Sequence, residues 1–276
     1  MIDNLSVNTF FCQFNKNDLK EIRLTLIKNY LCLKNIELMR RFSKLPGRVK
    51  GLFLALRLHV LIPIKTFSFL TYMAKMSRWR KQNPPMGMCD FYSPKFDYAK
   101  RFQLFEHIIE AQKLDTSIDY LEFGVSTGNS FRWWINRLKN DGARFYGFDT
   151  FTGLPEDWGA FKKGDMSNGN EPPKIEDNRH TFYQGLFQQT LLPFLTSYQS
   201  EKRKIIHMDA DIYTATLYVL TLLTPYLRKG DIIFFDEFNV PLHEFKAFID
   251  WSESFYINYK VLGSVNNYYQ VGILIQ

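Results

Sequence analysis

The chain has 276 residues, of which 46% are hydrophobic, 17% aromatic and 23% charged, which excludes an intrinsically disordered protein. The formal charge of +7 is uneven, because residues 1–100 hold 18 Lys and Arg against 6 Asp and Glu, and the rest hold 17 against 22. The three cysteines, Cys12, Cys32 and Cys89, are widely spaced, which argues against a disulfide scaffold or a thiolate zinc site and suits a reducing compartment.

The basic front of the chain is predicted to be a helical extension over residues 1–95. Residues 1–15 show no secretory signal, and the apolar run 52–64 is too short and too charged to span a membrane. Basic clusters flank this run, and Trp79 lies in the second cluster. Two interpretations stay open: an interfacial helix on an anionic membrane, or helices that pack on the core or on a second subunit.

These features define the expected partners and location. No zinc finger, RNP-type motif or Gly/Arg-rich segment is present, so nucleic acid is not expected as a partner. We expect a cytoplasmic protein, with peripheral contact at the inner face of the membrane under the first interpretation. A homo-oligomer is compatible with the second interpretation, in which the helices pack on the core or on a second subunit.

The back of the chain, residues 96–276, alternates between strand-like and helix-like segments. It follows a linker at 82–92 and begins with an amphipathic helix at 97–113, in which Tyr98 and Phe105 share the apolar face. Strands are predicted at 118–123, 144–148, 181–183, 204–208, 232–235, 259–265 and 268–275. Further helices are predicted at 130–139, 187–198, 214–227 and 241–255. This order predicts an α/β, Rossmann-like domain with a mostly parallel seven-stranded sheet and an antiparallel edge hairpin.

Acidic residues and glycines follow the predicted strands, at the edge where parallel sheets bind ligands. Gly124 and Gly128 after the first strand allow the backbone to approach a ligand closely, although an ordinary tight turn would also use them. Asp149 after the second strand is placed to hold the two hydroxyls of a ribose, or else to cap a helix. Because a dinucleotide fold prefers three glycines, this spacing favours a ligand that carries a ribose without a pyrophosphate.

A cluster of carboxylates is predicted after the fourth and fifth strands. Asp209, Asp211, Asp236 and Glu237 cannot all be ionised close together without compensation, and a hard divalent cation would supply it. The alternative is that Asp211 caps the following helix and Glu237 is solvated. His207 alternates out of the fourth strand and is expected to pack rather than to act in catalysis.

Five segments of the back part together resemble the macrocin O-methyltransferase family of class I S-adenosylmethionine-dependent methyltransferases. They are EFGVSTGNS, YGFDTFTGLPEDW, YQGLFQQTL, HMDADIYTATLYVLTLLTPYL and GDIIFFDEF, which fall in the family's order within about residues 118–240. The resemblance implies methylation of a hydroxyl, typically on a sugar, with S-adenosylmethionine as the cofactor and Mg²⁺ as the metal. The acceptor would be a small molecule, a glycan or a glycolipid.

The resemblance also implies roles for residues of this chain. Glu122, Gly124 and Ser130 would line the methionine end of the cofactor, and Asp149 would hold its ribose. The border of the adenine would be formed by Gln184, Gly185 and Leu186.

The same resemblance divides the carboxylates between two tasks. Asp209, Asp236 and Glu237 would bind metal, and Asp211 would be the general base. The family usually has two consecutive Asp residues where this chain has Asp236-Glu237, so the longer Glu side chain changes the expected metal geometry.

Two other functions are compatible with the residues alone. One is a methyltransferase-like fold that binds a partner without catalysis, and the other is a nicotinamide-dependent oxidoreductase, against which the missing third glycine argues. The polar stretch 156–178 is a candidate lid that excludes water from the site.

Overall fold

The computed structural model describes Lys34, residues 46–158 and residues 160–276. The chain divides into two compact units between Ile64 and Lys65. In the first unit, α3 (Gly47–Ala55) is followed by the 3-10 helix η2 (Leu58–Leu61), and neither element contains a buried residue. Within the described residues, no helix has the length and apolar character needed to cross a membrane.

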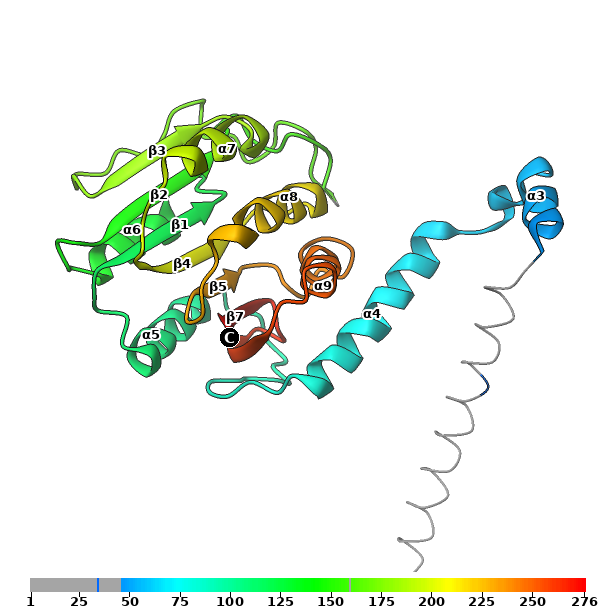
Figure 1. Cartoon of the computed structure of the whole chain (residues 1–276), viewed down its shortest axis with the longest axis horizontal. Helices are drawn as coiled ribbons and strands as arrows, with labels where there is room; N and C mark the ends of the chain where they lie inside the picture. The colour runs from blue at the N-terminus through cyan, green and yellow to red at the C-terminus, as the bar shows by residue number, and fades with distance from the viewer. Residues whose placement is uncertain (1–33, 35–45, 159) are drawn as a thin grey trace, which may run out of the picture. The chain divides into compact units, whose positions relative to one another are not determined.

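The second unit is built on a seven-stranded sheet (Figure 1). Its strands are β1 (Ile118–Phe123), β2 (Arg144–Asp149), β3 (His180–Gln184), β4 (Arg203–Met208), β5 (Ile232–Phe235), β6 (Tyr259–Val265) and β7 (Gln270–Ile275). Their spatial order is β3-β2-β1-β4-β5-β7-β6, and only the pairings of β7 are antiparallel. This topology confirms the predicted Rossmann-like fold with an antiparallel edge hairpin.

The helices of this unit follow the predicted order with shifted ends. They are α4 (Ile64–Gln82, whose first residue belongs to the first unit), α5 (Lys100–Gln112), α6 (Asn129–Arg137), α7 (Phe187–Ser197), α8 (Tyr213–Leu223), the 3-10 helix η3 (Thr224–Tyr226) and α9 (Glu244–Ser254). The predicted helix 214–227 ends early as an α-helix, because Pro225 cannot continue its hydrogen bonding. β7 begins two residues later than predicted, since the left-handed residues Asn266 to Tyr268 form a longer turn.

Both faces of the sheet are covered by helices, and alternate residues of each strand enter two separate cores. On one face, Leu121 and Phe123 of β1 pack with buried residues of α7, α8 and α9. On the other face, Tyr120 of the same strand packs with buried residues of α5 and α6. The sheet is therefore a rigid platform that presents the carboxyl ends of its parallel strands at one edge (Figure 1).

Part of the predicted extension belongs to the same compact unit as the sheet. Trp79 of α4 is buried against Phe238 and Phe248, and its indole N–H donates to the Tyr259 hydroxyl at 2.7 Å. The segment after α4 runs along β6, where the Gly87 N–H donates to the Leu262 carbonyl at 2.9 Å. The end of α4 and the segment after it thus pack with the sheet unit, within the range 1–95 that is predicted as an extension.

Candidate active site

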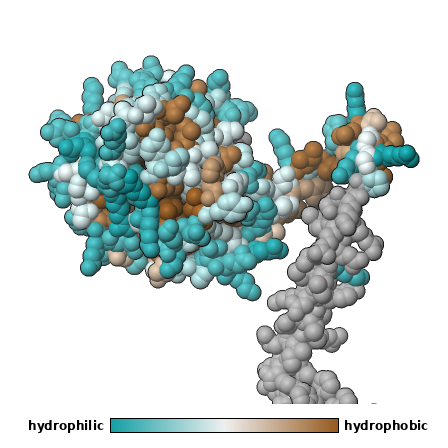
Figure 2. All heavy atoms as spheres, viewed as in Figure 1, coloured by the Kyte–Doolittle hydropathy of each residue, from teal (hydrophilic) through white to brown (hydrophobic). Residues whose placement is uncertain are grey.

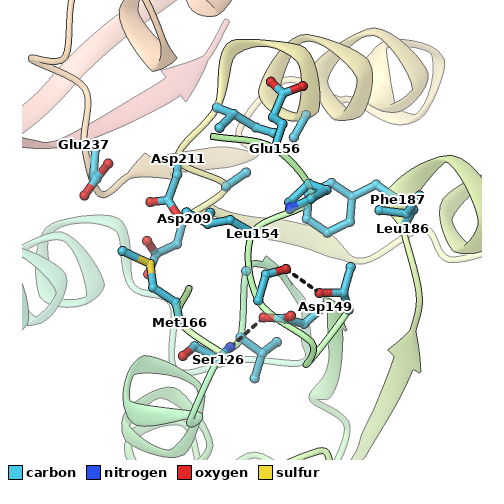
Figure 3. Close-up of a pocket in the computed structure, with 18 of the residues that line it drawn as sticks. Ser126, Asp149, Leu154, Glu156, Met166, Leu186, Phe187, Asp209, Asp211 and Glu237 are labelled. Atoms are coloured by element: carbon cyan, nitrogen blue, oxygen red, sulfur yellow. Dashed lines mark hydrogen bonds between the residues drawn. The ribbon is translucent and has the colours of Figure 1, made fainter. Parts of the chain in front are cut away.

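A cavity of about 570 Å³ lies at the carboxyl ends of the parallel strands (Figure 3). Its volume falls in the range of about 300–1,000 Å³ that is common for small-molecule sites. Seven of the predicted site residues line it: Gly124, Ser130, Asp149, Leu186, Asp209, Asp211 and Glu237. Four lie outside its wall: Glu122, Gln184, Gly185 and Asp236. The structure therefore brings most of the predicted residues to one cavity.

The turn after β1 depends on a glycine for a reason that the sequence did not reveal. Gly124 has a φ of +97°, and a Cβ atom at this position would overlap the backbone carbonyl of Asp209. The Asp209 N–H donates in turn to the Phe123 carbonyl at 2.9 Å. Gly124 thus allows the ends of β1 and β4 to meet, in addition to lining the cavity.

Replacement of this glycine is expected to destabilise the fold. Gly124→Ala should lower the free energy of unfolding by about 1–3 kcal/mol, because it combines a left-handed backbone with a clash against Asp209. Gly164→Ala is the matched control, since Gly164 has a φ of +91° but nothing within 4 Å of its hypothetical Cβ atom. Urea denaturation measures both, and equal losses for the two variants would contradict the role of the strand contact.

Glu122 lies beneath the cavity, where it positions a residue of the wall. Its side chain is fully buried, and Oε1 accepts a hydrogen bond from the Ser130 hydroxyl at 2.7 Å. Oε2 accepts from the Tyr120 hydroxyl, which also lies 2.9 Å from His207 Nδ1. Glu122 can therefore influence a ligand only by orienting Ser130. His207 is fully buried, as expected for a packing residue.

The Asp149 side chain connects the turn after β1 with the turn after β2 at the edge of the cavity (Figure 3). Its Oδ2 accepts from the Ser126 N–H and its Oδ1 from the Phe151 N–H, both at 2.7 Å. Burial raises the pKa of Asp149, and these hydrogen bonds oppose that shift. Since each carboxylate oxygen has two acceptor sites, both retain capacity for ligand hydroxyls. The residue fixes the loop after β2 instead of capping a helix.

The three residues predicted to border the adenine differ in whether they face the cavity. The Gly185 N–H donates to the Asp149 carbonyl at 2.9 Å, and the Gln184 amide donates to Asn170 Oδ1 at 2.8 Å. Leu186 directly precedes α7 and lines the cavity together with Phe187 (Figure 3). Of the three predicted residues, only Leu186 faces the cavity.

Asp211 and Glu237 form an interacting pair of carboxyl groups at one side of the cavity. Burial raises the pKa of Asp211 to about 6, and interaction with Glu237 opposes this rise. Burial and the charge of Asp211 raise the pKa of Glu237 to about 8. The Tyr269 hydroxyl donates to Glu237 Oε1 at 2.5 Å. Burial thus raises the pKa of both carboxyl groups, so the pair holds a proton more readily than two exposed carboxyl groups would.

Asp236 faces a buried arginine that the sequence analysis did not single out. Arg101 Nη1 donates to Asp236 Oδ2 at 3.1 Å and to the Tyr98 hydroxyl at 2.6 Å. Tyr98 donates to the same Asp236 oxygen, and burial raises the pKa of Tyr98, which keeps its proton in place. Arg101 lies on the same face of α5 as the buried residues Leu104 and Ile108. A charged residue at a helix position that the apolar pattern predicts to be buried was the signal that could have identified it.

The predicted metal ligands do not fit Mg²⁺ in this arrangement. In the part of the chain that the structure describes, no three His, Cys, Asp or Glu side chains are grouped so that they could hold a metal ion. Asp209 lines the cavity, whereas Asp236 pairs with Arg101 and Glu237 accepts from Tyr269. The strand ends are adjacent as predicted, but Asp236 and Glu237 each use one oxygen for a different partner, and the other oxygen of each is buried without a partner.

The loop after β2 supplies wall residues for which no role was predicted. Leu154, Glu156 and Met166 line the cavity, and Glu156 Oε1 accepts from the Thr214 hydroxyl of α8 at 3.1 Å. Internal hydrogen bonds, such as Leu154 N–H to the Asp165 carbonyl at 2.9 Å, give this loop a defined shape. Its position beside the cavity is compatible with the predicted lid over 156–178.

Comparison with known families identifies the domain type. Residues 121–238 match the family described as a methyltransferase domain. The match lies within residues 96–276, where the methyltransferase domain is predicted. No curated protein matches the chain.

Several solved structures are similar to this chain at low sequence identity. The calicheamicin methyltransferase CalS11 is 19% identical with a TM-score of 0.49, covering 77% of this chain and 93% of its own. The O-methyltransferase NovP is 19% identical with a TM-score of 0.47, covering 64% and 78%. An O-methyltransferase from Bacillus cereus in complex with SAH is 16% identical with a TM-score of 0.44, covering 79% and 94%.

Proposed function

We propose that the protein is an S-adenosylmethionine-dependent O-methyltransferase. The observation that carries this proposal is that Asp149 and Asp211 line one cavity of about 570 Å³ at the carboxyl ends of the strands. A ribose-binding acid and a basic carboxylate in the same cavity are what transfer from this cofactor to a hydroxyl requires. The methyltransferase domain matched over residues 121–238 supports the same reaction class.

The cavity residues fit the cofactor at three points. Asp149 has free acceptor capacity for the ribose hydroxyls, and the backbone from Gly124 to Ser126 borders the methionine end. Leu186 and Phe187 offer apolar surface to the adenine. When bound, S-adenosylmethionine supplies an electrophilic methyl group. The chain must then align the acceptor hydroxyl with that group and exclude water.

Asp211 is the residue that removes the proton of the acceptor hydroxyl. An ordinary Asp has a pKa of about 3.9 and is a weak base for this task. Burial raises the pKa of Asp211 to about 6, which brings it closer to neutral pH. Glu237, which accepts a hydrogen bond from Tyr269, interacts with Asp211 at the cavity wall. Because Mg²⁺ does not fit the observed carboxylates, no step of this mechanism passes through a metal.

The proposed acceptor is a hydroxyl of a sugar, glycan or glycolipid. The resemblance to the macrocin O-methyltransferase family supports this class, and the polar wall groups of Glu156, Asp211 and Thr214 provide hydrogen-bond partners for a polyhydroxylated ligand. Binding of such an acceptor beside the loop after β2 would place it next to the proposed base.

The test is turnover of S-adenosylmethionine against a panel of nucleotide sugars and glycolipids. Mass spectrometry should detect S-adenosylhomocysteine together with an acceptor that has gained one methyl group. Cofactor binding without turnover on any acceptor would instead favour the catalytically inactive binding protein. Binding of NAD in place of S-adenosylmethionine would favour the oxidoreductase.

We also propose that the basic front part contacts an anionic membrane at its cytoplasmic face. From residue 38 to residue 89 the sequence has 11 Lys and Arg and no Asp or Glu. In the first unit, Leu54 of α3 is 74% exposed and Leu61 of η2 is 78% exposed. In the second unit, Phe67 and Leu70 of α4 are both 57% exposed. Hydrophobic surface is visible on the part of the molecule outside the sheet region (Figure 2). Exposed apolar side chains among unopposed cations are typical of interfacial membrane helices.

Loss of three positive charges is expected to weaken membrane binding strongly. The variant with Arg48, Lys50 and Arg57 replaced by Gln should lose about 3 kcal/mol of affinity for anionic vesicles, at about 1 kcal/mol per charge. Co-sedimentation with phosphatidylserine vesicles at 0.1 M salt, about the ionic strength of the cell, measures it. Truncation through residue 80 is unsuitable, because it would remove the buried Trp79 from the core.

The matched control for this experiment changes the same charge elsewhere. Its substitutions are Lys139→Gln, Lys163→Gln and Lys229→Gln, at exposed positions of the second unit. This variant should bind the vesicles like the unchanged protein. If the unchanged protein does not bind even at low salt, the packing interpretation is favoured, and a dimer in solution would identify the second subunit as the partner.

A further inference from the structure

Arg101 is a buried cation at the wall of the cavity. Its side chain is 3% exposed and forms an ion pair with Asp236, which is 1% exposed. The guanidinium also stacks on the Tyr98 ring, with its central carbon 3.9 Å from the ring centroid. Removing a charge from water costs several kcal/mol unless it is paired.

The neighbourhood of Arg101 is strongly acidic. Arg101 and Tyr98 line the same cavity as Asp209, Asp211 and Glu237. The Nε–H of Arg101 is buried and has no hydrogen-bond partner among the described residues. The guanidinium thus lies in the wall of the cavity that Asp211 also lines, with one N–H unsatisfied.

Asp236 already forms an ion pair with this arginine. Both Nη1 of Arg101 and the Tyr98 hydroxyl donate to Asp236 Oδ2, and the other oxygen, Oδ1, is buried without a partner. A metal ion held by Asp209, Asp236 and Glu237 would have to share Asp236 with this ion pair. It would also bring a divalent charge next to a guanidinium, which is repulsive in a buried site.

We propose that Arg101 takes the place of a metal ion in this protein and is the built-in positive charge of the acceptor site. The guanidinium balances the carboxylates and favours negative charge as it develops on the acceptor oxygen. Transfer is then independent of divalent cations. The part of this inference that concerns turnover rests on the proposed methyltransferase function, whereas the part that concerns metal binding stands without it.

Metal titration tests the inference without any need for activity. Calorimetric titration of Mn²⁺ or Mg²⁺ into the full-length protein, at concentrations up to 1 mM, should show no binding at this site. Arg101→Met should gain Mn²⁺ binding, because Asp236 loses its counter-cation. Binding of one Mn²⁺ by the unchanged protein, lost in Asp209→Asn, would overturn the proposal even if Arg101→Met does not fold.

Turnover gives a second, separate readout. Chelation with EDTA should leave methyl transfer unchanged, and Arg101→Met should lower kcat by about 10²-fold, the scale of one lost transition-state donor, with the KM for S-adenosylmethionine unchanged. Arg101→Lys keeps the charge and should recover part of the loss. Arg137→Met, which removes a partly exposed arginine of α6 paired with Glu106, is the control that should leave kcat unchanged.

The outcomes separate the two proposals. Loss of turnover on chelation, restored by Mg²⁺, would overturn the role of Arg101 and keep the methyltransferase. If no methyl transfer occurs under any condition, the proposed function fails, and the Mn²⁺ titration still decides whether Arg101 excludes a metal.

Discussion

Asp211→Asn is expected to lower the turnover number by about 10²–10⁴-fold, which is the usual contribution of a general base. The amide cannot accept the proton of the acceptor hydroxyl, but it preserves the size of the side chain. Asp211 has a φ of +58°, a conformation that Asn tolerates well, so the backbone should keep its shape. Steady-state kinetics with a fixed acceptor measure the effect, and the affinity for S-adenosylmethionine should stay within about twofold.

Two further variants make this result specific. Asp157→Asn changes an exposed carboxylate of the loop after β2, paired with Lys162, and should leave turnover unchanged. Glu237→Gln leaves the carboxylate of Asp211 in place, so it should retain much more activity than Asp211→Asn. Full activity of Asp211→Asn would remove Asp211 as the base, and a greater loss in Glu237→Gln would transfer that role to Glu237.

Asp149→Ala is expected to weaken S-adenosylmethionine binding by about 1–3 kcal/mol, or about 5- to 150-fold in Kd. The carboxylate would lose its hydrogen bonds to the ribose, and its two backbone contacts with Ser126 and Phe151 would loosen the adjoining turns. Asp149→Asn separates these effects, because the amide keeps one oxygen acceptor for the turns. Calorimetry gives the affinities.

The control for this prediction is Asp115→Ala. Asp115 is an exposed residue outside the cavity wall, and its carboxylate pairs with Arg137. Its cofactor affinity should equal that of the unchanged protein. Thermal denaturation shows whether Asp149→Ala is still folded under the conditions of the titration. A folded Asp149→Ala variant that binds with unchanged affinity would contradict the ribose assignment.

The fold could be predicted from the sequence because its strands carry a strong local signal. β1 and β5 are apolar segments followed by acids or glycine, and the chain alternates them with helical segments. The ends of elements were less accurate, since they depend on single residues. Pro225 shortens α8, and the side chains of Asn266 and Asn267 bind the backbone of Asp97 and Ser93 and so extend the last turn.

The site could be predicted only as a set of backbone positions. The carboxylates after β4 and β5 are adjacent, as the order of strands in the sheet requires, but the direction of each side chain depends on partners that are distant in sequence. Asp236 turns to Arg101, 135 residues before it, and Glu237 turns to Tyr269. Tyr98 was assigned to the apolar face of a helix, yet it precedes α5 and donates to Asp236.

The loop after β2 shows the same limit. Its Gly and Pro residues predict irregular structure, and its polar composition suggests a lid. Leu154 and Met166 reach the cavity through hydrogen bonds internal to the loop, which no periodic pattern encodes.

Calorimetric titration of S-adenosylmethionine into the full-length protein tests the central claim most directly, because every proposed role of the cavity depends on this ligand. One molecule should bind per chain, and S-adenosylhomocysteine should compete for the same site. Absence of binding at millimolar cofactor, with the protein shown to be folded, would contradict the account.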